Sequence, residues 1–124
     1  MTKFWRHFSS NGLSRRIERR LGVFGHPAAV TPGLKRRLGL TSSRGFVVRL
    51  VLPDSPAHAA GLIEDDVVVS LAESPVRDTA SLHRLLGRLP ADLPLALVLV
   101  RDGRKLERWV LLNGRTDWQR TQTN

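Results

Sequence analysis

The sequence contains no cysteine, which excludes a disulfide framework and any site built on a thiolate. No apolar run approaches the roughly 20 residues of a membrane-spanning helix. The opening residues, MTKFWRHFSSNGLSRRIERR, also lack the apolar stretch of a signal peptide. As written, the chain is therefore expected to be cytoplasmic. Its 124 residues, 41% of them hydrophobic, suit one globular domain with short tails.

Motifs for catalysis and cofactor binding are also missing. The sequence has no GxSxG nucleophile elbow, no HExxH metal motif and no nucleotide-binding glycine loop, and its four histidines are scattered. Asp54, Ser55 and His58 lie close together in DSPAHAAGL, but a serine before a proline is more typical of a helix cap than of a catalytic triad. We predict no enzyme activity, metal, cofactor or small-molecule substrate.

Acidic residues are scarce in the first third of the chain. Residues 1–44 hold ten Lys or Arg against one acidic residue, Glu18, a net charge of +9, whereas the other 80 residues balance ten against ten. A basic arm therefore precedes a neutral body. Such an arm is typical of a solvated segment, and the alternative is that it binds an anionic membrane or a nucleic acid.

The remaining sequence predicts strands and turns. GFVVRLVLP (residues 45–53) and DVVVSLAES (residues 66–74) are rich in β-branched residues, which favours strands. LALVLVRDGRKLERWVLL (residues 95–112) predicts a hairpin around Asp102-Gly103, where both turn residues need a positive φ. A short strand is expected in LGVFG (residues 21–25), where Gly25 and the following Pro27 are expected to end it.

Two helices are expected between these strands. A short one is capped by Ser55, and a longer one is capped by Asp78 and closed by Pro90. The longer helix has Leu82, Leu85, Leu86 and Leu89 at helical spacing. One or two further helical turns are expected over residues 31–39, with Thr31 as their cap. The predicted fold is mainly β, a small curved antiparallel sheet or partly open barrel capped by one short and one longer helix.

The order of these motifs resembles a bacterial PDZ domain, of the kind that follows the protease domain in HtrA-type serine proteases. SPAHAAGL resembles the short helix of that family, SLHRLL its groove helix, LVLVRDGRKLE its closing hairpin and LGVFGHPAAVTPGLKRRLGL its lead-in. We therefore predict a basic arm over 1–18, a PDZ domain over 19–113 and a disordered tail over 114–124. Two departures affect turns: IEDD replaces Pro-Gly-Asp, and AES replaces Asn-Gly.

The resemblance implies a peptide site. PDZ domains bind a free C-terminal carboxylate through consecutive backbone N–H groups of a loop, and the peptide adds to the sheet as an antiparallel strand. The match assigns these amides to Leu21, Gly22 and Val23, and the side chains of Leu21 and Val23 to the pocket for the last ligand residue. Arg20 or Arg19 is assigned as a supporting cation. The groove and pocket then comprise Phe24, Gly25, His26, Leu82, His83 and Leu86, with Leu85 as an alternative to Leu86.

Three functions follow from these observations. The first is a peptide-binding module that captures free C-termini or extended apolar segments. The second is a regulatory PDZ fragment of an HtrA-type protease that lacks its catalytic domain, which would be periplasmic or membrane-associated. The third is anionic membrane or nucleic-acid binding through the arm. We also expect residues 1–17 to be dispensable for peptide binding, and Gly22→Asp to block the carboxylate without touching the core.

Overall fold

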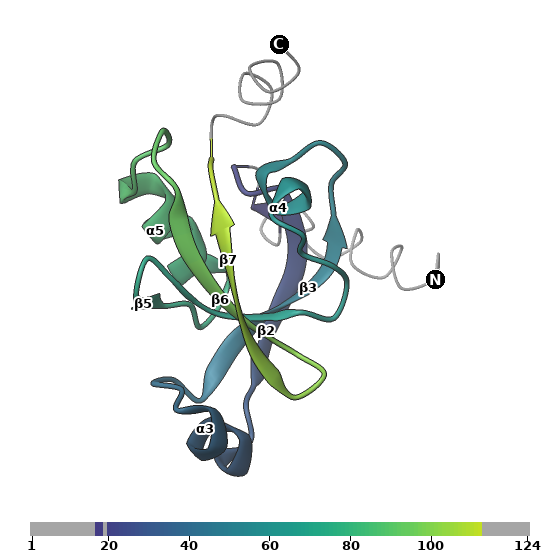
Figure 1. The fold of residues 1–124 in the computed structure, drawn as a ribbon, viewed down its shortest axis with the longest axis vertical. Helices are drawn as coiled ribbons and strands as arrows, with labels where there is room; N and C mark the ends of the chain where they lie inside the picture. Colours follow the sequence, from purple (N-terminus) through teal and green to yellow (C-terminus); the bar gives the residue numbers. More distant parts are fainter. Residues whose placement is uncertain (1–16, 19, 113–124) are drawn as a thin grey trace.

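The computed structural model of the chain describes residues 17–18 and 20–112, which form a twisted, open antiparallel sheet with three helices (Figure 1). The strands are β1 (Ile17–Glu18), β2 (Val23–Ala29), β3 (Arg44–Val51), β4 (Val67–Leu71), β5 (Ser74–Pro75), β6 (Leu95–Arg101) and β7 (Arg104–Val110). The helices are α3 (Pro32–Leu38), α4 (Pro56–Ala59) and α5 (Thr79–Arg88). In the described part, the strand order is β1-β2-β3-β4-β6-β7, with β5 beside β4.

The predicted fold class is confirmed, and the helical turns expected over 31–39 are the third helix, α3. The predicted tail over 114–124, Arg19 and the arm up to residue 16 lie outside the described residues. Ile17 and Glu18, which we assigned to the arm, form β1 and belong to the sheet. None of the helices in the described ranges is long and apolar enough to cross a membrane.

The helix caps follow the local sequence. Thr31 Oγ1 accepts a hydrogen bond from the Leu34 N–H at 3.3 Å, and α3 ends at Gly39 with a φ of 67°. Ser55 Oγ accepts from the His58 N–H at 3.1 Å at the start of α4. Each hydroxyl thus satisfies an N–H group that the first helical turn leaves without a backbone partner. The predicted caps at both residues are confirmed.

Helix α5 begins with a capping box. The Asp78 carboxylate accepts from the Ser81 N–H at 2.8 Å, and Ser81 Oγ accepts from the Asp78 N–H at 3.1 Å. The hydrogen bond from the Ser81 backbone holds the pKa of Asp78 below its usual value. Leu82 and Leu86 on the inner side of the helix are fully buried, as their spacing predicted.

Apolar side chains form two clusters. The larger cluster contains leucines and valines from β2, β3, β4, β6 and β7 together with residues of α4 and α5. The smaller cluster joins Leu34 and Leu38 of α3 to side chains of β4 and β6. Figure 1 shows α4 and α5 towards one end of the sheet and α3 at the opposite end. Because Val23 of β2 and Leu82 and Leu86 of α5 share the larger cluster, this cluster fixes the position of α5 relative to β2.

Strand β2 is longer than we predicted. Gly25 and Pro27 do not end it: pairing with β3 continues to Ala29, which lies opposite Arg44. A Cβ at Gly25 would lie 1.9 Å from the Val47 carbonyl oxygen, so the glycine permits a close backbone approach beside a β-bulge. Beyond Phe24, β2 has a strand partner on one side only among the described residues, and an edge of this kind tolerates proline.

The turns show what the two family departures do. Asp102 and Gly103 have φ values of 52° and 74°, which confirms the predicted hairpin turn. Ala72 and Glu73, the residues that replace Asn-Gly, form the two-residue turn between β4 and β5 with φ values of 50° and 69°. Asp65 stands at the glycine position of Pro-Gly-Asp and has a φ of 77°. The backbone keeps the turn geometry without the favoured residues.

Replacing Ala72 and Glu73 by asparagine and glycine is expected to raise the free energy of unfolding by about 1 kcal/mol. The left-handed conformation has a higher free energy for Ala and Glu than for Asn and Gly. The added glycine offsets part of the gain because it raises the conformational entropy of the unfolded chain. Urea titration measures the change. Glu64→Gly, at an exposed loop residue outside the positive-φ set, is the control and should give no gain. Equal stability of the parent and the double variant would contradict the argument.

Candidate functional site

The loop before β2 is held by its carbonyl groups. The Leu21 carbonyl accepts from the Ala57 N–H and the Gly22 carbonyl accepts from the Leu52 N–H, both at 2.9 Å. In a trans peptide unit the N–H of the next residue points opposite to the carbonyl, and no described peptide bond is cis. The N–H groups of Gly22 and Val23 therefore point away from α4 and Leu52. Two consecutive amides so oriented suit an anion.

Gly22 is required by the local backbone and by its neighbour. Its φ is 88°, in the region that side-chain-bearing residues rarely adopt. A Cβ built on Gly22 would lie 2.2 Å from Ser55 Cβ and 2.5 Å from Ser55 Oγ, so the loop packs directly on the capping residue of α4. The expectation that Gly22→Asp spares the core is wrong, because any side chain at this position meets Ser55.

The structure brings the predicted pocket residues into one cluster. Leu21, Val23, Leu82 and Leu86 all have 0% exposure and share the larger apolar cluster. Phe24 at the start of β2 is buried as well. Leu85, which we kept as an alternative to Leu86, is only partly buried and packs against the same cluster. Of the two leucines, Leu85 is the one with surface left for a ligand to contact.

The two predicted groove histidines differ in exposure. His83 is exposed on α5, whereas His26 is half-buried on β2. The His26 ring has Nε2 3.2 Å from the Arg49 Nε and Nδ1 3.0 Å from the Pro27 carbonyl oxygen. A neutral ring with its proton on Nδ1 satisfies both contacts, since the guanidinium is a donor.

Sequence reasoning did not identify Arg49 as part of this site. Its guanidinium bonds to Asp65 as well as to His26, so it links β3 to β2 and to the loop before β4. A signal existed: Arg49 is the one charged residue in the apolar stretch 45–53. A charge inside such a stretch points to a specific partner.

Arg20 contacts the end of helix α5. Its Nη1 donates to the Leu86 carbonyl, one of the last carbonyls of the helix. A cation is favourable there because the C-terminal carbonyls carry the negative end of the helix dipole. The role of Arg20 with a peptide carboxylate stays a prediction.

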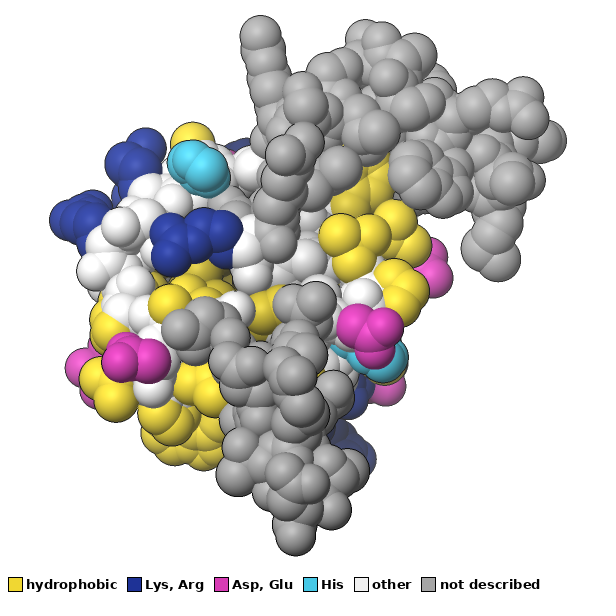
Figure 2. Space-filling view, turned by 90° about the horizontal axis from the view of Figure 1, so that it is seen from above, with side chains coloured by type: hydrophobic (Ala, Val, Ile, Leu, Met, Phe, Trp, Pro, Cys, Tyr) yellow, Lys and Arg dark blue, Asp and Glu magenta, His cyan; other side chains and the backbone are white. Residues whose placement is uncertain are grey.

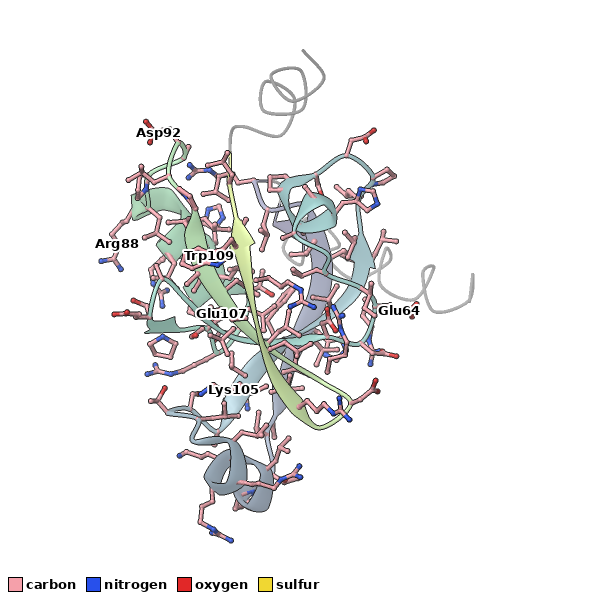
Figure 3. The ribbon with its side chains drawn as sticks, in the orientation of Figure 1. Glu64, Arg88, Asp92, Lys105, Glu107 and Trp109 are labelled. Atoms are coloured by element: carbon pink, nitrogen blue, oxygen red, sulfur yellow. The ribbon has the colours of Figure 1, made fainter. Side chains whose placement is uncertain are left out.

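The two edges of the sheet differ. At one edge β1 pairs antiparallel with β2, with Ile17 opposite Phe24 and Glu18 opposite Val23, and β1 also contacts α5. The other edge is β7, where Lys105, Glu107 and Trp109 are exposed (Figure 3). Charged side chains on an edge strand disfavour the addition of another strand. The edge of β2 is therefore the better acceptor.

The surface around this end of the molecule is mixed. Figure 2, which looks onto the end carrying α4 and α5, shows apolar side chains at the surface in several separate places and a group of basic side chains at the upper left. Among the described residues, the large apolar side chains that are exposed are Leu52, Ile63, Leu93 and Trp109. No group of three or more His, Cys, Asp or Glu within the described ranges is arranged to hold a metal.

Comparison with known proteins gives the same family on independent grounds. The sequence model of the PDZ domain family matches residues 26–112. The periplasmic serine endoprotease DegP of Escherichia coli K12 is 34% identical over 86 residues, which cover 69% of this chain and 18% of that protein. A probable periplasmic DegP-like endoprotease of Rickettsia conorii is 31% identical over 78 residues, 63% of this chain and 15% of that protein. The chain thus spans less than a fifth of these relatives.

Solved structures agree with the fold. The HtrA-type protease AlgW with a decapeptide matches at 30% identity and a TM-score of 0.56, covering 73% of this chain and 27% of that one. The HtrA3 PDZ domain bound to a phage-derived ligand, FGRWV, matches at 24% identity and a TM-score of 0.53, covering 73% and 81%. The chain belongs to the PDZ domain family, and its PDZ domain is homologous to those of the DegP and HtrA-type serine proteases of bacteria.

Proposed function

We propose that this chain binds peptides that end in a free carboxylate, by adding them as an antiparallel strand to β2, and that it performs no catalysis of its own. The observation that carries the proposal is the loop before β2, where the bonded carbonyls of Leu21 and Gly22 turn the next two N–H groups away from α4 and Leu52. AlgW and the HtrA3 PDZ domain, both with peptides, support the same kind of partner.

The chemistry of capture is electrostatic at one end and apolar beside it. A carboxylate at the loop receives charge-assisted hydrogen bonds from the amides of Gly22 and Val23, with Leu21 as the third candidate donor. The backbone of the peptide then forms hydrogen bonds along the outer edge of β2, and these bonds do not depend on the peptide's sequence. Its last side chain lies between the loop and α5, where Leu85 still has exposed surface.

The peptide FGRWV with a free C-terminus is expected to bind with a dissociation constant in the micromolar range, which corresponds to a binding free energy of roughly −8 kcal/mol. The same peptide with an amidated C-terminus should bind at least tenfold more weakly, because it has no terminal carboxylate to accept charge-assisted hydrogen bonds from the loop amides. Fluorescence polarisation of a labelled peptide measures both. Equal affinities of the acid and the amide would overturn the carboxylate assignment.

A second candidate function is that of the regulatory PDZ domain of an HtrA-type protease. The short share of DegP that the chain covers favours it. In that case binding of the ligand would regulate a protease domain. The compartment would be the periplasm, which is the location given in the names of the DegP relatives. An upstream reading frame for a trypsin-like domain would support this function. Binding of anionic membranes or nucleic acids through the basic arm stays a prediction.

A further inference from the structure

We infer that β1 is an internal competitor for the peptide site, so that a peptide binds only after Ile17 and Glu18 leave the edge of β2. The inference rests on the proposed function and adds to it a form of regulation within the chain. It follows from where β1 lies, from what holds it there and from which part of the edge it leaves open.

The position of β1 is that of an added strand. It pairs antiparallel with Val23 and Phe24, the two residues of β2 nearest the carboxylate loop, and it contacts α5. A peptide whose carboxylate lies at the loop would run antiparallel to β2 over the same two residues. Each outward N–H and C=O group of β2 bonds one strand at a time. The peptide and β1 therefore exclude each other at the pocket end of the groove.

The connection from β1 to the loop is fastened to the groove helix. Arg20 follows β1 by two residues, and its guanidinium donates to the Leu86 carbonyl of α5. Leu86 is a predicted pocket residue and is fully buried, as are Leu21 and Val23 on the loop side. With β1 paired to β2 and Arg20 bonded to α5, the chain itself occupies the pocket end of the groove.

The rest of the β2 edge is open. In the strand order of the described part, no strand other than β1 lies outside β2, and β1 reaches only to the residue opposite Phe24. Residues 25–29 continue β2 beyond it. The upstream residues of an incoming antiparallel peptide lie along this open part. A longer peptide can pair there first and then replace β1 at the pocket.

The cost of opening is modest because β1 has only two residues. Each net hydrogen bond favours the closed state about fivefold, so one or two of them lower the apparent affinity for a peptide by roughly 5–30-fold. This range is large enough to measure and small enough for a good ligand to overcome.

The first test breaks β1 in the full chain. The double variant Ile17→Pro/Glu18→Pro removes both N–H groups and is expected to bind free-acid FGRWV roughly 5–30-fold more tightly than the parent. The control is Ile17→Ala/Glu18→Ala, which keeps the N–H groups and should stay within about twofold of the parent. If the proline variant binds no more tightly than the alanine variant, β1 is not a competitor.

The second test locks β1 in place. The chain has no cysteine, so Ile17→Cys/Phe24→Cys introduces a single pair at directly opposed positions. The oxidised protein is expected to bind FGRWV at least tenfold more weakly than the same protein after reduction. Equal binding in the oxidised and reduced states overturns the inference.

The two proposals fail in different ways. If the parent binds FGRWV and the proline and disulfide variants match their controls, the competitor inference fails and the peptide-binding function stands. If no form, including the proline variant, binds FGRWV or a library of free C-termini, the function fails and the competition fails with it. In that case formation of the disulfide would still show that β1 lies beside β2.

Discussion

Replacing Asp66 by asparagine is expected to lower the free energy of unfolding by about 3 kcal/mol. The Asp66 side chain has 0% exposure, and its carboxylate accepts from Arg101 Nε and Nη2, each at 2.8 Å, and from the Ile63 N–H at 2.9 Å. The hydrogen bond with Asp66 raises the pKa of Arg101. An amide at this position cannot accept all of these hydrogen bonds, and it leaves the Arg101 guanidinium without the negative charge that neutralises it.

The neighbouring carboxylate provides the control. Asp65 pairs with Arg49, but its side chain is 73% exposed, and asparagine tolerates its positive φ. Asp65→Asn should therefore cost less than about 1 kcal/mol. Urea titrations followed by circular dichroism measure both variants. Losses of equal size would show that burial of the Asp66–Arg101 pair does not decide its contribution.

The importance of this pair for the proposed site is indirect. The loop that ends at Asp66 exchanges hydrogen bonds with Val48 of β3: the Asp65 N–H donates to the Val48 carbonyl and the Val48 N–H donates to the Asp66 carbonyl, each at 2.8 Å. Strand β3 in turn pairs with the whole length of β2. Asp66→Asn should therefore weaken peptide binding only as far as it unfolds the domain.

The elements that the sequence predicted are those with local signals. The cap at Asp78 and the leucine spacing of α5 lie within one helix, and Asp102-Gly103 determines its own turn. Such signals act over a few residues and survive without tertiary contacts. The resemblance to the PDZ family then placed Leu21, Leu82 and Leu86 near one another, which spacing alone did not.

The features that the sequence did not reveal depend on contacts between distant residues. Strand β1 has two residues and no pattern, and it exists only because β2 offers an edge and Arg20 reaches α5. The bulge beside Gly25 accommodates Arg49, which the β2–β3 register skips. The residue that constrains Gly22 is Ser55, on another element. Although β1 and β2 are neighbours in the chain, Arg20 and Leu86, like Gly22 and Ser55, lie too far apart for one short window of sequence to contain both.

Replacing Gly22 by alanine is expected to lower the free energy of unfolding by about 2–5 kcal/mol, in addition to any effect on a ligand. Two causes add. An alanine at a φ of 88° is strained, and its Cβ would lie 2.2 Å from Ser55 Cβ, an atom fixed to the backbone at the start of α4. The matched control is Gly33→Ala in α3, where no atom lies within 4 Å of an added Cβ. This control should gain about 0.5–1 kcal/mol from helix propensity.

A second substitution separates the two causes. Ser55→Gly removes the two side-chain atoms that a Cβ added at Gly22 would meet, leaving Ser55 Cα at 3.6 Å, an ordinary contact. On its own it costs a few tenths of a kcal/mol as a change of capping residue. Gly22→Ala/Ser55→Gly should therefore recover the steric part and retain the roughly 1–2 kcal/mol of the positive φ. A double variant no more stable than Gly22→Ala would show that the backbone conformation alone requires glycine. Binding of FGRWV to the double variant then reports on the loop amides without the clash, which Gly22→Asp cannot do.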